Sequence, residues 1–535
     1  MNKRFGVMLD MSRNAVMKPD EVKKYASVIK KLGYNMIQLY TEDTYEVQNE
    51  PYFGYMRGRY TVEELKDIDK YCASIGVEVI PCMQTLAHLG RIFKWNTYKN
   101  INDFADILLV DNERTYQLIE NMIKTLRECF KSEYIHIGMD EAHMLGLGNY
   151  LGIHGYQNRF SILKKHLERV LEIVKKYNFK PIMWSDMFYR LASNGEYYAR
   201  NAEITDEIKN SCPPEVGLVY WDYYHDDKAF YDDMIKSHKK FGRELWFGGG
   251  AWTWTGFTPN NRWSLDSMLP AMQSCRENDV ENIFITIWGD DGRECSPYAV
   301  LPSLYAIRCY YVGNNDMGSI KSSFKELTGE DFDAFMMLDA ADVSDQKISG
   351  KQANPSKFML YSDILSGFLD SCITPGSGNL YADYAAKLKD YSGKSSFAYL
   401  FETQAALCEV LSLKVDLGIR CRKAYKENDR TELSKAVSDI GTVIAGTEKL
   451  YKALRSQWFR ENKPQGFDVQ DQRFGGLLLR LKSCQERLTE YLEGRAESIP
   501  ELEEKLLDFY GNGEDFEKKL PLLNNWKENV TVNNI

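Results

Sequence analysis

Apolar and polar residues alternate along the first half of the chain in a pattern that repeats eight times. Short runs rich in Val, Ile and aromatic residues are each followed by a stretch with an apolar residue at every third or fourth position. The runs predict strands at residues 5–9, 35–40, 77–82, 134–138, 180–184, 216–221, 244–248 and 282–288. Helices are predicted between them, for example after Pro19 and after Thr61, where Thr61 and Glu64 have the spacing of a capping box.

Eight strand–helix units predict an α/β fold, a (β/α)8 TIM barrel in residues 1–315. A doubly wound sheet is the alternative, but it has no reason to stop at eight units, and no glycine-rich phosphate loop follows the first strand. Long helical patterns then replace the strands, at residues 356–372, 382–428, 431–459 and 471–494. We therefore predict an all-α domain in residues 316–535, which serves either as a dimerisation surface or as a wall over the pocket.

Composition and charge narrow the class of protein. The 67 Lys and Arg residues against 77 Asp and Glu leave a net charge of −10 without a basic block, which argues against a nucleic-acid partner. The 44% of apolar residues can form a large core. The eleven cysteines lie singly, and the apolar run at 5–9 is too short for a signal peptide or a membrane span. We therefore expect a cytoplasmic protein with reduced thiols and no membrane partner.

Two adjacent acids, Asp140 and Glu141, follow the fourth predicted strand, where a TIM barrel carries its active site. Side chains alternate along a strand, so both carboxyls reach one pocket only if the backbone leaves strand geometry, which Gly138 makes easier. One carboxyl would then stay protonated as an acid while its neighbour stays ionised. The alternative interpretation is an ordinary solvated helix start.

Tryptophans gather at the same predicted end of the barrel. Flat aromatic faces bind the apolar faces of sugars, whereas the alternative for each residue is core packing. Those at the ends of strands five, six and eight are Trp184, Trp221 and Trp288, and those in or after strand seven are Trp246, Trp252 and Trp254. Several of them at matching strand ends favour a sugar-binding wall.

Further polar residues follow the first three strands. Arg13 can donate to two neighbouring sugar hydroxyls, with a surface salt bridge as the alternative. His88, with Glu42 and Asp43, is expected to form a support chain that orients the acid.

Histidines beside the acids raise the question of a metal. His136 precedes them in the fourth strand, and we expect it to have a structural or supporting role. A metal site built from His136, Asp140, Glu141 and His143 would require ligands that converge from several strands. We therefore expect neither a metal nor another cofactor.

Three motifs together resemble glycoside hydrolase family 20, the β-N-acetylhexosaminidases. They are His-x-Gly-x-Asp-Glu at the fourth strand, Asp-x-x-Arg after the first, and Trp-x-Asp at residues 184–186. A barrel that starts at the first residue and a helical C-terminal part are similar to a bacterial subgroup of this family. The similarity covers the barrel well and the helical part mainly in size and class.

The resemblance implies a retaining hydrolysis in which the 2-acetamido group of the substrate is the nucleophile, an exception to the usual two-carboxylate scheme. Glu141 would be the acid and base, and Asp140 would orient the acetamido N–H and balance its charge. Arg13 would hold the hydroxyls at carbons 3 and 4. The remaining sugar contacts would come from Trp184, Trp221, Trp288, Trp252 or Trp254, and Asp290.

The sequence departs from the family pattern at several positions. The tyrosine expected in the seventh strand has no clear counterpart. Tyr223 and Tyr224 are the candidates to replace it, with Tyr223 preferred because it shares the side of Trp221. Asp290 stands where a glutamate is common. We therefore expect an exo-acting enzyme on terminal GlcNAc or GalNAc, with a homodimer as a candidate assembly. The alternatives are a conventional retaining β-glycosidase and a non-catalytic sugar-binding protein.

Overall fold

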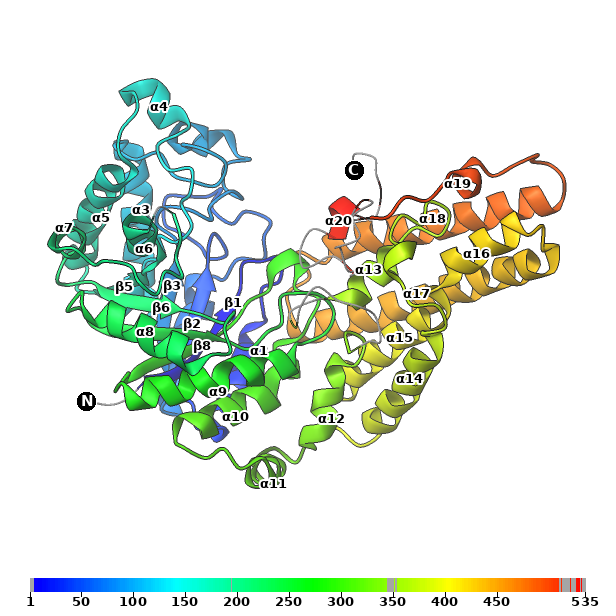
Figure 1. Ribbon diagram of the computed structural model, residues 1–535. Coiled ribbons are helices and arrows are strands. Elements are labelled where there is room, and N and C mark those ends of the chain that lie inside the picture. The colour runs from blue at the N-terminus through cyan, green and yellow to red at the C-terminus, as the bar shows by residue number, and fades with distance from the viewer. Residues whose placement is uncertain are drawn as a thin grey trace. The chain divides into compact units, whose positions relative to one another are not determined.

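Eight parallel strands form a closed barrel in chain order in the computed structural model (Figure 1). The structure describes residues 4–193, 195–343, 351, 354–509, 511, 520, 526–529 and 531. The strands are β1 (Arg4–Asp10), β2 (Met36–Thr41), β3 (Glu78–Met83), β4 (Tyr134–His136), β5 (Lys180–Trp184), β6 (Gly217–Trp221), β7 (Leu245–Gly250) and β8 (Asn282–Ile287). Arg4 of β1 lies opposite Asn282 of β8 and closes the barrel. The predicted α/β class and TIM barrel are confirmed.

Observed and predicted strands differ by at most two residues at either end. The informative difference is at β4, which ends at His136 although the apolar pattern continues to residue 138. Gly138 and Met139 have φ values of +70° and +69°, so the backbone is left-handed there. The strand therefore stops just before the two acids.

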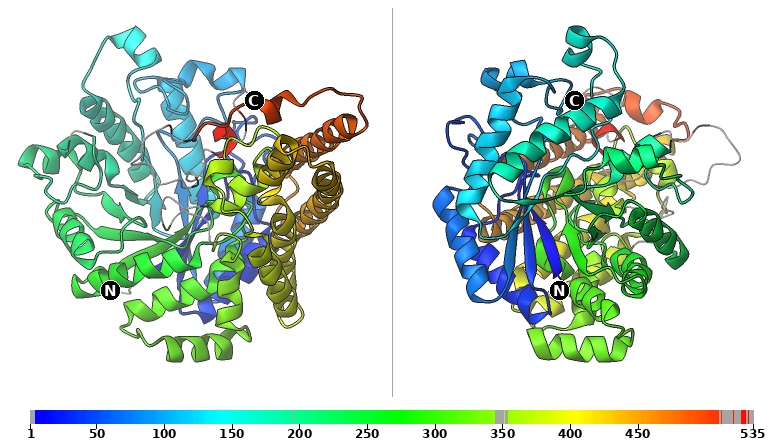
Figure 2. Two further views of the ribbon diagram at one scale, coloured as in Figure 1. Left: turned by 45° about the vertical axis from the view of Figure 1, so that its right-hand side comes forward. Right: turned by 90° about the vertical axis from the view of Figure 1, so that its left-hand side faces the viewer.

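Helices surround the strands of the barrel (Figure 2). The predicted capping box is present at the start of one of them: Thr61 Oγ1 accepts from the Glu64 N–H, and the Glu64 carboxylate accepts from the Thr61 N–H. The helices are α1 (Pro19–Lys31), α2 (Val62–Ser74), α3 (Glu113–Cys129), α4 (Asn149–His154), α5 (Arg159–Lys176), α6 (Asp186–Ala192), α7 (Asp206–Ser211), α8 (Lys228–Lys239), α9 (Asn261–Glu277), α10 (Leu301–Tyr311) and α11 (Met317–Thr328).

The chain forms two compact units, and segments of the barrel sequence belong to each. The first contains Met1–Ala251, Ser264–Trp288 and Ser303–Thr328. The second contains Trp252–Trp263, Gly289–Pro302 and Gly329–Ile535. The segments that directly follow β7 and β8 along the chain are thus part of the second unit.

The rest of the second unit is helical, as predicted. Neighbouring long helices pack in sequence order, α14 on α15, α15 on α17 and α17 on α18 (Figure 1). The helices are α12 (Phe332–Met336), α13 (Pro355–Tyr361), α14 (Gly378–Ser392), α15 (Ala398–Lys414), α16 (Leu417–Lys426), α17 (Arg430–Glu461), α18 (Asp468–Leu492), α19 (Pro500–Glu503) and α20 (Trp526–Asn529). All eleven cysteine side chains of the protein are buried. Across the described ranges, no helix combines the length and the apolarity that are needed to cross a bilayer.

Two of the predicted long helices are wrong in extent. The pattern at 356–372 breaks after α13, because the Asp363 carboxylate accepts the N–H groups of Leu365 and Ser366 and closes a turn. The pattern at 382–428 divides into α14, α15 and α16. Turn-forming residues at 392–396, with Gly393 among them, end α14, and apolar periodicity alone does not detect such a break.

Candidate active site

Asp140 and Glu141 approach the same histidine. The Nε2 atom of His88, on the loop after β3, lies 3.1 Å from Asp140 Oδ2 and 3.8 Å from Glu141 Oε2. Glu141 itself has a φ of +52°, so the left-handed backbone continues through the pair. At Gly138 a Cβ atom would lie 2.0 Å from the side-chain oxygen of Gln84, which only glycine avoids. This departure from strand geometry brings neighbouring carboxyls to one side of the chain.

Asp140 is held in its ionised form. Gln84 Nε2 donates to Asp140 Oδ1 at 2.8 Å, and His88 Nε2 bonds the other oxygen. Burial acts to raise the pKa of Asp140, but the charge and hydrogen bond of His88 outweigh it and lower the pKa to about 2. Burial likewise acts to lower the pKa of His88, and the Asp140 carboxylate raises it to about 9. The two groups therefore form an ion pair near neutral pH.

Glu141 has the opposite electrostatic environment. Its side chain is 43% exposed, and its main-chain N–H donates to Asp186 Oδ2 at 3.1 Å. Partial burial raises the pKa of Glu141, and the negative charge of Asp140 raises it further. Two adjacent carboxyls thus differ in their readiness to carry a proton.

A chain of hydrogen bonds connects Asp140 with Arg13. Gln84 Nε2 also donates to the Tyr40 hydroxyl at 3.1 Å, and that hydroxyl donates to Glu42 Oε1 at 3.1 Å. Arg13 Nε donates to the same Glu42 oxygen at 3.0 Å. Glu42, after β2, is therefore connected to Asp140 by hydrogen bonds through Tyr40 and Gln84. Its role as a support residue stays a prediction.

Asp43 and the main chain of His88 bond residues outside this hydrogen-bonded chain. Asp43 accepts a hydrogen bond from Arg57 Nε at 3.2 Å. The main-chain N–H of His88 donates to Asp106 Oδ2 at 3.0 Å. Asp106 was not singled out in the sequence, because an acid in a long loop has no distinguishing local pattern.

Aromatic residues and Arg13 gather around Tyr40. The Tyr40 and Trp288 rings meet edge to face at 4.8 Å, and the Arg13 guanidinium lies 5.7 Å from the Trp288 ring centre. The Trp184 ring lies 6.2 Å from that of Trp288. Trp288 Nε1 donates to the hydroxyl of Tyr223 at 3.2 Å. Tyr40 also joins this aromatic cluster to Asp140 through Gln84.

Tyr223 contacts both Trp288 and Trp221. The ring of Tyr223 stacks on Trp221 with centres 5.4 Å apart. Tyr224 follows with a side chain that is 37% exposed. The structure thus brings the predicted Trp221 and Tyr223 into the same cluster as Trp288.

The remaining aromatic candidates differ in position. Trp246, near the start of β7, packs on Tyr134, the first residue of β4, with ring centres 5.4 Å apart. It is therefore a core residue at the other end of the barrel. In the second unit, Trp252 and Trp254 stack at 4.3 Å. Asp290, also in that unit, begins a short 3-10 turn after β8. A role of these three second-unit residues in sugar binding stays a prediction.

His136 is buried beneath the acids. Its Nδ1 atom accepts the N–H of Gly138 at 3.1 Å, and its ring lies 4.6 Å from that of Trp184. Burial lowers its pKa to about 3, so the ring is neutral. The ring therefore lies against the left-handed turn and the predicted sugar wall.

In the part of the chain that the structure describes, one cluster of side chains has the spacing of a metal site. It contains His88, Asp140 and Glu141, and one possible ligand atom of each lies within 4.8 Å of the others. Neither His136 nor His143 belongs to it. His88 Nε2 and Asp140 Oδ2, the atoms that would bind an ion, are hydrogen-bonded to each other. We assign these atoms to the hydrogen bond and not to a metal.

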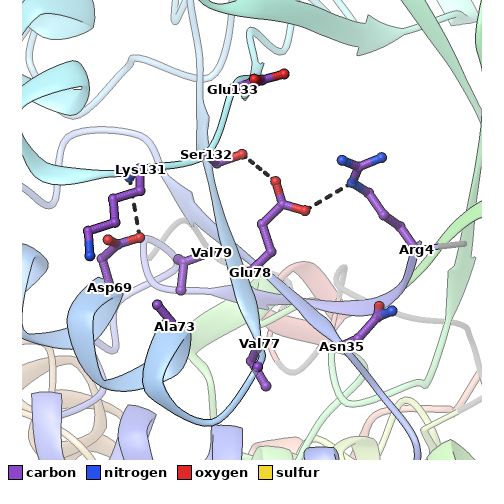
Figure 3. Close-up of a pocket in the computed structure, with 11 residues that line it drawn as sticks. Arg4, Asn35, Asp69, Ala73, Val77, Glu78, Val79, Lys131, Ser132 and Glu133 are labelled. Carbon is purple, nitrogen blue, oxygen red and sulfur yellow. Dashed lines mark hydrogen bonds and ion pairs between the residues drawn. The ribbon is translucent and has the colours of Figure 1, made fainter. Parts of the chain in front are cut away.

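A cavity of about 510 Å³ lies at the opposite end of the barrel, where β1 to β4 begin (Figure 3). Glu78 accepts from Arg4 at 2.9 Å and from Ser132 at 2.7 Å across it. The chemistry of TIM barrels lies at the carboxyl ends of the strands, so this cavity is separate from the candidate active site.

Two family models match separate parts of the chain. Residues 5–208 match the family described as glycosyl hydrolase family 20, catalytic domain, and residues 333–520 match the glycoside hydrolase 20C C-terminal domain. Hexosaminidase D of Bos taurus is 26% identical over 242 residues, which are 42% of this chain and 62% of that protein. Hexosaminidase D of Homo sapiens is 26% identical over 41% of this chain and 45% of its own length.

The chain thus spans less than two thirds of these two curated relatives. Among solved structures, the β-N-acetylhexosaminidase of Bacteroides fragilis NCTC 9343 is similar, with 20% identity and a TM-score of 0.47. The match covers 61% of this chain and 70% of that one.

Proposed function

Because the chain belongs to glycoside hydrolase family 20, we propose that it is an exo-acting β-N-acetylhexosaminidase that releases terminal, non-reducing GlcNAc or GalNAc from oligosaccharides or glycoconjugates. The observation that carries this proposal is the pair of adjacent carboxyls with opposite pKa shifts, both within reach of His88. A site that cleaves a glycosidic bond needs one carboxyl that gives up a proton and one that stays charged.

Substrate assistance fits this division. The acetamido oxygen of the bound sugar attacks the anomeric carbon while Glu141 transfers its proton to the departing glycosidic oxygen, and a cyclic oxazolinium ion forms. Glu141 then removes a proton from the water that opens this ion, which regenerates the acid and retains the anomeric configuration. Asp140 accepts the acetamido N–H and balances the positive charge that develops there, and its pKa of about 2 keeps it ionised for this role.

The sugar is held by the cluster around Tyr40. Trp184, Trp221 and Trp288 supply flat faces, and the Tyr223 hydroxyl is the donor to the acetamido oxygen. Arg13, fixed by Glu42, holds the hydroxyls at carbons 3 and 4. Trp252 or Trp254 is a further predicted sugar contact, and Asp290 is the predicted partner of the hydroxyls at carbons 4 and 6.

No step of this proposal uses a metal or an organic cofactor. The cytoplasmic location and the homodimer remain predictions.

The direct test is hydrolysis of three nitrophenyl substrates in parallel: the β-N-acetylglucosaminide, its galacto epimer and the plain β-glucoside, each with and without a chelator. Turnover of the two acetamido sugars alone, unaffected by chelator, is the expected result. Similar cleavage of the plain glucoside would indicate a conventional nucleophile, which would also leave a trappable glycosyl-enzyme. Binding without turnover would indicate a sugar-binding protein.

Variants of the two acids test their roles. E141Q should lose about 10²–10⁴-fold in kcat on substrates with poor leaving groups, the usual contribution of general acid catalysis. D140N should lose about 10²–10³-fold even with a good leaving group, because the charge on the acetamido group is then unbalanced. An E128Q variant, at a largely exposed helical position, is the control. Full activity of D140N would rule out this form of substrate assistance.

A further inference from the structure

A third carboxyl, that of Asp186 in the Trp-x-Asp motif, contacts the main chain of Glu141. Asp186 is the first residue of α6 and follows β5 by two positions. Its side chain is fully buried, and its Oδ2 atom accepts the N–H of Glu141 at 3.1 Å. The contact joins residues 45 positions apart in the chain.

A carboxylate is a costly acceptor at this place. Oδ1 of Asp186 is buried and has no hydrogen-bond partner among the residues that the structure describes. Arg190 Nε lies 3.5 Å from Oδ2, while Asp140 and Glu141 are the negative groups nearby. Burial, and then the charge of Asp140, raise the pKa of Asp186 to about 7. An amide or hydroxyl would accept the same N–H without burying a charge, so stability alone does not explain an acid here.

The position of Asp186 suggests what the acid does. Met139 and Glu141 both have left-handed backbones, which persist only where the surroundings enforce them. The Met139 N–H donates to Gln84 Oε1 at 3.3 Å, so the segment is held from the loop after β3. Asp186 holds it from the opposite side, after β5. The direction of the Glu141 carboxyl therefore depends on two side-chain anchors.

We propose that Asp186 is a positioning residue for the acid and base Glu141: its buried carboxyl accepts the Glu141 main-chain N–H and so fixes the direction in which the Glu141 carboxyl delivers its proton. This inference rests on the proposed function and deepens it. The charged groups that act on Glu141 are Asp140 and His88, with Arg190 and Arg13. Asp186 adds the contact that fixes where the proton is delivered.

Two substitutions weaken the anchor to different degrees. D186N keeps an oxygen that accepts the Glu141 N–H, but its N–H₂ group meets no acceptor at the buried position of Oδ1. D186A removes the acceptor altogether. For each variant, kcat and KM are measured on aryl β-N-acetylglucosaminides with good and poor leaving groups, because only poor leaving groups depend strongly on a general acid.

For D186A we expect a loss of about tenfold or more in kcat on the poor leaving group, a small loss on the good one, and an almost unchanged KM. For D186N we expect a smaller loss of kcat on the poor leaving group than for D186A, because the amide oxygen still accepts the Glu141 N–H while the N–H₂ group lacks a partner at the position of Oδ1.

Asp69 provides a matched control. It is 5% exposed, its pKa is also raised by burial, and it accepts the main-chain N–H of Lys131 at 3.5 Å, but it borders the cavity at the other end of the barrel (Figure 3). D69N should leave the leaving-group dependence unchanged. If the wild type is active and both Asp186 variants behave like D69N, the inference is overturned while the proposed function stands. If the wild type cleaves no acetamido sugar, both the proposed function and this inference fail. If D186A does not fold, the comparison of D186N with D69N still tests the inference.

Discussion

At the scale of single residues, two chemically similar side chains acquire different roles from their surroundings. Asp140 is bonded by His88 and Gln84, which lower its pKa, while for Glu141 burial and the negative charge of Asp140 outweigh the nearby cations and raise its pKa. The difference arises from contacts to the loop after β3. A substitution in that loop should therefore change the pKa of Asp140 more than that of Glu141.

Replacement of His88 tests this directly. H88N removes the positive charge, and Asn readily adopts the left-handed conformation that His88 has at φ +59°. The pKa of Asp140, now about 2, should rise by about one to three units. Activity needs ionised Asp140, so the acid limb of kcat/KM against pH should move to higher pH by that amount. An unmoved limb would contradict the pairing, and H154N, at an exposed position on α4, is the control.

Gly138 allows a second comparison at this scale. An alanine at position 138 would have to adopt a left-handed backbone, at φ +70°, and its Cβ would clash with the Gln84 side chain. Gly242 has φ +65° with no atom within 4 Å of an added Cβ, so G242A measures backbone strain alone, about 1–2 kcal/mol of unfolding free energy. G138A should cost more than G242A in a denaturant titration and should lower kcat, because Gln84 is displaced from Asp140. Equal effects would show that Gly138 matters only for strain.

At the scale of elements, the second unit holds the segment after β8 through buried charges. Lys357 of α13 is fully buried, and its Nζ atom lies 2.6 Å from both Asp291 and Glu294. Arg473 of α18 binds the same two acids at 3.0 and 2.9 Å. Two helices far along the chain thus fix the segment that carries Asp290.

Removal of one partner from this network should be strongly destabilising. K357M leaves two buried acids with a single cation, and such a change typically costs about 3–5 kcal/mol of unfolding free energy. The double variant K357M/D291N should recover part of that loss, because Glu294 and Arg473 then remain as a pair of opposite charges. K394M, which breaks an exposed pair at the C-terminal end of α14, should change stability by less than about 0.5 kcal/mol. The measurement is denaturant unfolding of the wild type, K357M, the compensating variant and K394M. A loss of unfolding free energy in K357M as small as that in K394M would contradict the prediction.

At the scale of the whole molecule, the two compact units are not consecutive in sequence. The segments Trp252–Trp263 and Gly289–Pro302 leave the barrel strands but pack within the helical unit. A division at residue 315 remains a prediction, which assumes that each part folds alone.

Expression of the two parts tests that division. Residues 1–315 alone would contain Asp291 and Glu294 without Lys357 and Arg473, so we expect this fragment to be poorly folded by circular dichroism and inactive on nitrophenyl N-acetylglucosaminide. Co-expression with residues 316–535 should restore soluble, active protein. A folded, active fragment 1–315 would instead establish it as an independent domain.

Most of the fold could be predicted because its signals are local. Apolar periodicity located all eight strands, and the capping box located the start of α2. The extents of α13 to α16 were not predicted, since side-chain turns such as that of Asp363 interrupt a helix without changing its apolar pattern. Trp246 shows the same limit for the site: its sequence position resembled that of the other tryptophans, and the barrel places it at the other end.

The barrel, the helical second part and the candidates Asp140, Glu141 and Arg13 could be predicted from the chain alone, because residue type and distance from a strand end are local properties. The hold of Gln84 and His88 on Asp140, and of Asp186 on Glu141, became visible only in the folded protein. These contacts join residues 45 to 56 positions apart. The shared burial that shifts their pKa values exists only once the strands have closed into a barrel.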